Sequence, residues 1–138
     1  MKQYSAILLA MLLITTTVMA RDIGIQLGHI SGVLLSSKES GSENLTIAMG
    51  VNERDMALQI QKNKTFPLQT IRNWSWYYGI SGEIMTKSST EIGVGIPFGL
   101  IYTFTEGPRF FAELTPMISV GSKFMVSLNP EIKVTLPL

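Results

Sequence analysis

The sequence predicts an all-β protein, an eight-stranded antiparallel up-and-down transmembrane β-barrel that follows an N-terminal signal peptide. Three observations lead to this prediction. Only 15% of the 138 residues are charged, although 46% are hydrophobic. The chain begins with a short apolar segment, and its second half alternates between apolar and small or polar residues. An alternation with a period of two is typical of strands whose two faces meet different surroundings.

The composition excludes several classes of protein. Lys and Arg together number 11 and Asp and Glu number 10, so no basic surplus indicates a nucleic-acid partner. The chain has no cysteine, which excludes a disulfide framework, a thiolate zinc site and a cysteine nucleophile. With a single histidine, a transition-metal site is not expected either. We therefore expect one domain with no cofactor and no metal.

Residues 1–20 are predicted to be a signal peptide, and residues 21–138 the barrel domain. Lys2 supplies the positive charge at the start, residues 6–14 form the apolar centre, and residues 18–20 form a small-x-small cleavage site. The apolar part is shorter than the roughly 20 residues that a membrane-spanning helix needs. We expect cleavage after Ala20 and export to the bacterial outer membrane.

Four segments carry the alternation most clearly, at residues 74–87, 92–104, 110–120 and 124–138. One face of these segments carries no charge, and the other is mostly Gly, Ser, Thr and Pro with a few charged residues. A soluble barrel would turn the apolar face inward, whereas a membrane barrel turns it toward lipid. A small, weakly charged polar face suits a narrow lumen better than a solvated surface.

The first half of the chain supplies four shorter predicted strands. These are residues 23–28, 33–37, 45–51 and 56–61, joined by turns, and a longer connection follows at residues 63–73. The total is eight, and bacterial single-chain barrels use even numbers of strands from eight upward.

An even strand count places both chain ends on one side of the membrane, which for an exported chain is the periplasmic side. Several outward aromatic residues then converge on that rim, where amphipathic rings meet the headgroups. The alternative is that aromatic residues merely favour strands. The predicted interfacial girdle consists of Trp74, Trp76, Tyr78, Tyr102, Phe104 and Phe110.

Charged residues on the opposite face are expected to form a polar network in the lumen. An isolated ion inside a narrow barrel costs several kcal/mol, so these charges must be paired. The alternative is a paired-carboxylate catalytic site or a cation path, which the spacing alone does not support. The predicted network consists of Glu83, Lys87, Glu113, Glu131 and Lys133.

Three stretches of the second half resemble a family of small bacterial outer-membrane β-barrel proteins of the OmpA/OmpX type. They are WYYGISG at 76–82, IGVGIPFGL at 92–100 and FAELTP at 111–116. The resemblance implies an eight-stranded outer-membrane barrel and no particular activity. Two features depart from it, because the chain ends in Leu-Pro-Leu rather than an aromatic residue, and Gly95 stands where the family carries a basic residue.

The expected function is therefore non-enzymatic, a structural or interaction role of a monomeric barrel. Outer-membrane lipid and the barrel assembly machinery are its expected partners. One alternative is a soluble periplasmic or secreted barrel that binds an apolar ligand. The other is an enzyme acting on outer-membrane lipid, in which His29 would pair with Ser31 or Ser36.

Overall fold

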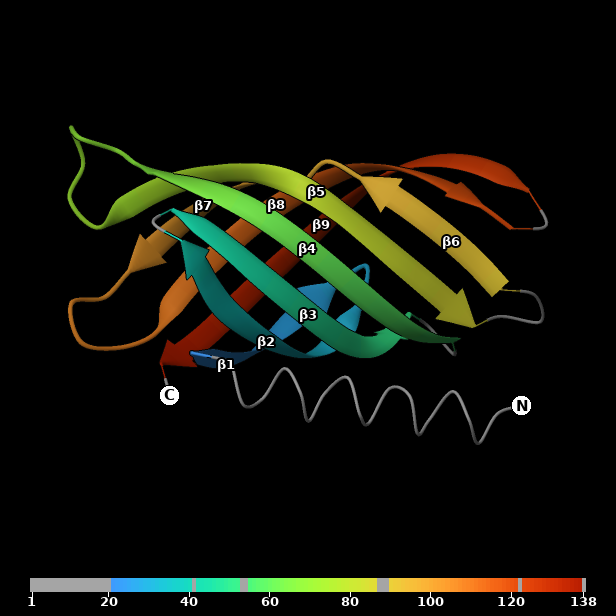
Figure 1. Cartoon of the computed structure of the whole chain (residues 1–138), viewed down its shortest axis with the longest axis horizontal. Coiled ribbons are helices and arrows are strands. Elements are labelled where there is room, and N and C mark those ends of the chain that lie inside the picture. Colours follow the sequence, from blue (N-terminus) through green and yellow to red (C-terminus); the bar gives the residue numbers. More distant parts are fainter. Residues whose placement is uncertain (1–20, 41, 53–54, 87–89, 122, 138) are drawn as a thin grey trace.

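The computed structural model describes residues 21–40, 42–52, 55–86, 90–121 and 123–137, and in this part of the chain every element is a β-strand (Figure 1). The predicted signal peptide lies outside the described residues. No helix of the described part is long and apolar enough to cross a membrane.

The strands form one antiparallel sheet. Their bounds are β1 (Asp22–Gly28), β2 (Ser31–Ser40), β3 (Glu43–Asn52), β4 (Asp55–Pro67), β5 (Trp74–Thr86), β6 (Thr90–Gly95), β7 (Phe98–Thr103), β8 (Arg109–Val120) and β9 (Phe124–Pro137).

The sheet closes into a ring, as the all-β barrel prediction requires. Strands β1 to β5 each pair with the next along the chain, β8 pairs with β9, and β9 pairs with β1. Both β6 and β7 lie between β5 and β8. The nine described strands therefore occupy eight places, because β6 and β7 share one.

The break between β6 and β7 differs from the continuous strand predicted at 92–104. It falls at Ile96 and Pro97, where the proline has no N–H to donate to a neighbouring strand. The pairing nevertheless continues through the break, because Ile96 N donates to Pro116 O and Gly79 N donates to Pro97 O, each at 3.1 Å. The chain therefore keeps its direction and its hydrogen bonds to both neighbouring strands, although the regular strand geometry is interrupted at the proline.

Strands β2 and β4 extend furthest beyond their predicted bounds. Strand β2 begins at Ser31, inside the turn expected between the predicted strands 23–28 and 33–37, and β4 runs on to Pro67, inside the predicted connection 63–73. The extension of β4 is held by the first half of β5, where Thr65 pairs with Tyr77 and Phe66 with Trp76. The mostly polar residues 62–67 therefore form a strand because they pair with β5, and such pairing cannot be seen in the local sequence.

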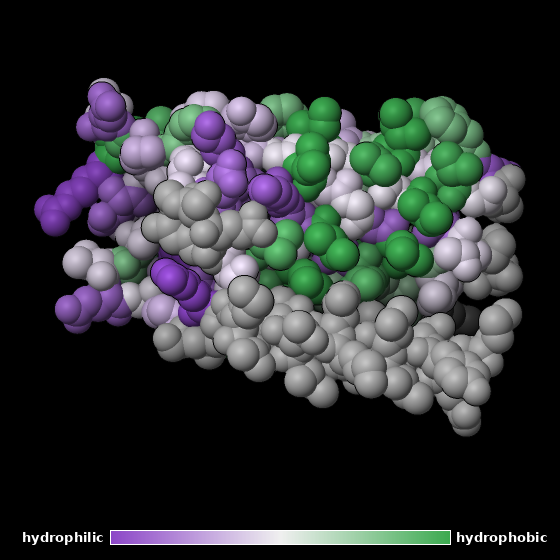
Figure 2. Space-filling view, viewed as in Figure 1, coloured by the Kyte–Doolittle hydropathy of each residue, from purple (hydrophilic) through white to green (hydrophobic). Residues whose placement is uncertain are grey.

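The two faces of the sheet have opposite chemistry. Inward positions hold most of the buried polar side chains, and large apolar side chains stand exposed on the outside. In Figure 2 apolar residues cover much of the visible surface to the right. A water-soluble globule has the reverse arrangement, with apolar side chains in its core.

One end of the ring is narrowed by the turn between β1 and β2. Ile30 is fully buried there, in contact with Ala57 and Met85. The turn begins at Gly28, whose φ of 139° is rarely adopted by L residues and whose Cβ position lies 2.3 Å from Pro130 O. A glycine at this point lets the turn fold back into the ring.

Candidate functional site

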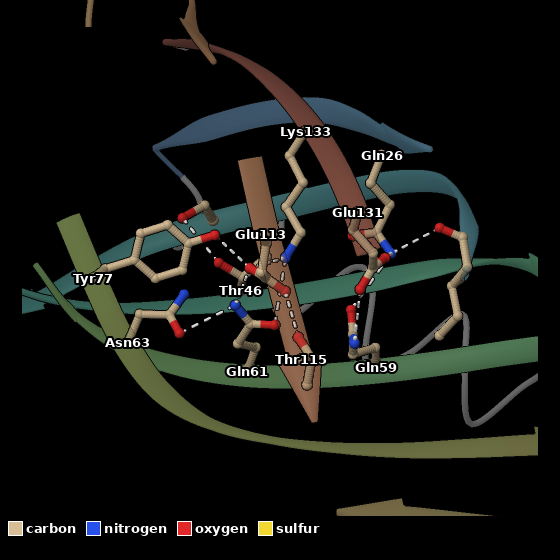
Figure 3. Close-up of polar contacts among 12 residues, drawn as sticks. Gln26, Thr46, Gln59, Gln61, Asn63, Tyr77, Glu113, Thr115, Glu131 and Lys133 are labelled. Carbon is tan, nitrogen blue, oxygen red and sulfur yellow. Dashed lines mark hydrogen bonds and ion pairs between the residues drawn. The ribbon is translucent and has the colours of Figure 1, made fainter. Parts of the chain in front are cut away.

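Glu113 is the hub of a buried polar network inside the ring (Figure 3). Lys133 Nζ lies 3.0 Å from its Oε2, and Gln61 Nε2 donates to the same oxygen at 2.8 Å. The Tyr77 hydroxyl also donates to Oε2, and Thr115 donates to Oε1 at 3.1 Å. Both oxygens of the carboxylate are therefore used by donors of the chain itself.

Glu131 forms the second centre of the network and is held by two amides. Gln26 Nε2 donates to its Oε2 at 2.7 Å, and Gln59 Nε2 to its Oε1 at 3.4 Å. Gln26 also donates to the backbone oxygen of Ile30, at 3.0 Å, which ties the network to the β1–β2 turn. Glu131 is the register partner of Glu113, so the two carboxylates come from neighbouring positions of β8 and β9.

Period-two alternation is what points these side chains inward. On β4 the inward side chains include Gln59, Gln61 and Asn63, which are two residues apart. Glu113 and Thr115 follow the same rule on β8. The network thus joins strands that are not neighbours in the ring, and a carboxylate on one wall meets donors from the opposite wall.

The structure brings together only part of the predicted lumen network. Glu113, Glu131 and Lys133 lie inside the ring, and each is buried. Glu83 is also buried and inward, but its Oε1 lies 2.9 Å from His29 Nε2 rather than in the network around Glu113. Lys87 lies outside the described residues.

Sequence reasoning missed the neutral members of the network, which are Gln26, Gln59, Gln61, Tyr77 and Thr115. The available signal was their position on the alternating face, since a polar residue on the inward face of a narrow barrel needs a partner.

His29 and Glu83 form a separate contact at the end of the ring that Ile30 narrows. Burial of the imidazole lowers the pKa of His29, but the hydrogen bond that its ring donates to Glu83 and the negative charges of Glu83, Glu131 and Glu91 raise it, and the net shift is upward from 6.5. The Asn52 amide contacts His29 Nδ1 at 3.2 Å and donates to the His29 carbonyl. Both ring nitrogens therefore have partners.

Replacing His29 by glutamine is expected to destabilise the protein at acidic pH more than at alkaline pH. A raised pKa means that the folded protein binds the imidazole proton more tightly than the unfolded chain does. The stabilisation is then fully present below the unfolded pKa of about 6.5 and disappears as the pH rises through the raised folded value. Urea unfolding of the wild type and of His29→Gln from about pH 5 to about pH 8 measures the difference in their free energies of unfolding. A difference independent of pH would contradict the ion pair.

The predicted girdle residues do lie side by side near one end of the ring. The ring centroids of Trp74 and Tyr102 are 5.2 Å apart, those of Tyr102 and Phe104 are 4.9 Å apart, and those of Phe104 and Phe110 are 5.7 Å apart. Trp76 and Tyr78 stack with centroids 6.0 Å apart.

Phe66 belongs to the same aromatic group and was missed because its segment was read as a connection. Its ring lies 4.6 Å from that of Trp76 and 5.8 Å from that of Tyr78, in stacked orientations. The signal that could have found it is the continued alternation of β4 beyond residue 61.

The serine–histidine arrangement of a lipid hydrolase is not assembled among the contacts of the described residues. The Ser31 hydroxyl bonds with the backbone of Gly28, and Ser36 accepts from Thr46. The partners of the His29 ring are Glu83 and Asn52. Within the described ranges, no group of three or more His, Cys, Asp or Glu side chains is placed to hold a metal ion.

Comparisons with protein-family models, with curated proteins and with solved structures find no significant match to this chain. The arrangement of its own residues therefore carries the functional argument.

Proposed function

We propose that this chain is a non-enzymatic integral β-barrel protein of the bacterial outer membrane, with a packed polar lumen, short loops and a structural or interaction role. In this proposal residues 1–20 are a cleaved signal peptide, and the barrel acts as a monomer inserted by the barrel assembly machinery. Its partners include the surrounding lipid. The resemblance to OmpA/OmpX-type barrels agrees with this proposal.

The observation that carries the proposal is the inversion of the two faces. The interior holds Glu113, Glu131 and Lys133 in a hydrogen-bonded network, whereas the outside exposes side chains such as Ile80 and Val126. Soluble monomers rarely expose contiguous apolar patches above a few hundred Å². In a lipid bilayer this apolar surface would contact hydrocarbon instead of water. A closed ring also leaves no strand edge with unpaired backbone groups in the hydrocarbon.

Strand length and aromatic placement support the same proposal. Strands β4, β5, β8 and β9 contain 13, 13, 12 and 14 residues. A tilted strand needs about 9–11 residues to cross the hydrocarbon. The aromatic group around Trp76 and Tyr102 lies near the end of the ring where β5 begins and β7 ends, as a headgroup-level girdle would.

The polar interior does not favour the alternative of a soluble barrel that binds an apolar ligand, because such a ligand inside the ring would meet charged and amide groups. A hollow of about 820 Å³ is instead lined mostly by residues of the outer face, with Glu113 and Glu131 at its base. Its lining includes Leu27, Leu100, Leu114 and Ile132, which point outward around the small side chain of Ala112. In a bilayer, acyl chains would fill this hollow.

Fractionation of the expressed full-length chain tests the proposal. We expect the protein in detergent-solubilised outer membranes, with a folded band whose gel mobility changes on boiling. Recovery as a soluble periplasmic protein would overturn the proposal.

Replacing Leu114 by arginine is expected to lower the free energy of unfolding in lipid vesicles by about 2–4 kcal/mol, because Leu114 is outward and near the middle of β8. Val120 is also outward but ends β8, so the Val120→Arg control should lose only about 0–1 kcal/mol. Urea unfolding from vesicles measures both. Equal, small losses would show that this face does not lie in hydrocarbon.

A further inference from the structure

The outer surface of the ring is interrupted by charge in one place. Among the strand residues whose side chains the structure describes, the outward register positions carry charges at Glu43, Lys62 and Lys64. All three lie on β3 and β4, near the end of β4. Figure 2 shows hydrophilic residues gathered to the left of the visible face, toward the side where β4 ends in Figure 1.

These residues surround a shallow hollow of about 210 Å³ between β3, β4 and β5. Lys62 pairs in register with Ile80, and Lys64 with Tyr78, so the two lysines stand on the same face two residues apart. The hollow is lined by Glu43, Lys62, Asn63, Lys64, Tyr78, Gly79 and Ile80.

Aromatic side chains lie on one side of the hollow and aliphatic side chains on the other. Lys64 Nζ lies 5.6 Å from the centre of the Phe66 ring, which stacks on Trp76 and Tyr78. On the other side, Ile60 and Ile80 are exposed and apolar. A ligand with a charged head and apolar chains would meet matching chemistry at both of its ends.

The net charge of these residues favours a ligand whose headgroup is negatively charged. Two lysines and one glutamate leave a net charge of +1 (2 − 1), and Lys62 Nζ lies 3.8 Å from Glu43 Oε2. Each ammonium has three donors and suits a phosphate as a compact point charge. The long apolar stems of lysine also allow the charged ends to reach headgroup level from the margin of an apolar belt.

We propose that Lys62 and Lys64, beside the Phe66, Trp76 and Tyr78 rings, bind the phosphate-bearing headgroup of an anionic phospholipid, whose acyl chains lie along Ile60 and Ile80. This inference rests on the proposed membrane location. It assigns to one side of the barrel a preference among lipids that the remaining apolar surface does not have.

Tryptophan quenching by brominated lipids tests this inference, because Trp74 and Trp76 are the two tryptophans of the chain and both lie at this rim. The full barrel is reconstituted in vesicles that contain brominated phosphatidylglycerol or brominated phosphatidylcholine at equal mole fraction. One net charge at the membrane surface corresponds to roughly a fivefold preference for the anionic lipid. Lys62→Gln/Lys64→Gln should abolish this preference, and Glu43→Gln should increase it.

Lys123, in the turn between β8 and β9, provides the matched control, and Lys123→Gln should leave the preference unchanged. Equal quenching of the wild type by both lipids would overturn this inference while leaving the membrane location intact. A preference that survives the double substitution would also overturn it. Absence of quenching by either lipid would instead overturn the proposed function. Heat-modifiable gel mobility confirms that each variant is folded.

Discussion

Gly95→Lys is expected to abolish folding of the barrel. Gly95 is an inward, buried position of β6, and an added Cβ would lie 2.7 Å from Thr115 Cγ2 and 2.9 Å from Pro116 O. The backbone oxygen cannot move without breaking the pairing of β6 with β8. A lysine there would also place an unpaired charge inside the ring, which costs several kcal/mol. We expect no band with heat-modifiable mobility after refolding in detergent.

The steric part of this effect can be separated from the charge with two alanine variants. Gly95→Ala adds the crowded Cβ alone and should lower the free energy of unfolding. Gly82→Ala on β5 is the matched control, since its added Cβ would have Gly93 O, at 3.9 Å, as its nearest neighbour. A folded Gly95→Lys protein, or equal stability of the two alanine variants, would show that the interior is not packed at this point.

Lys133→Met is expected to lower the free energy of unfolding by about 3–5 kcal/mol, the usual loss when one partner of a buried ion pair is removed. Lys133 Nζ lies 3.0 Å from Glu113 Oε2, and both side chains are almost completely buried. Without the ammonium, the Glu113 carboxylate keeps its neutral donors Tyr77, Gln61 and Thr115 but loses its countercharge. Urea unfolding in vesicles measures the loss.

A double-mutant cycle separates the ion pair from simple loss of packing. Glu113→Gln removes the carboxylate charge, so adding it to Lys133→Met should destabilise less than the sum of the single changes, by about 0.5–3 kcal/mol. Lys123→Met, at an exposed lysine, should leave stability unchanged. Additive losses would show that the two charges do not stabilise each other in the folded protein.

Much of the architecture was predictable because a period of two records the two surroundings of a strand. Strands β5, β8 and β9 appear close to their predicted segments, and inward residues such as Glu113 and Lys133 were assigned to the right face. The alternation shows which face of the sheet a side chain lies on, but not its position along the axis of the ring. It therefore does not show which inward residues meet across the ring. Glu83 was for this reason grouped with Glu113, although its partner is His29.

Sequence by itself thus determined the strand-rich fold, the chemistry of each face and the inward residues of the long strands, because these depend on local alternation. The closed structure decided the break at Pro97, the extension of β4 to Pro67, the burial of Ile30 and the partners of each carboxylate. These features depend on register between strands distant in the chain. Register sets the height of every side chain inside and outside the ring.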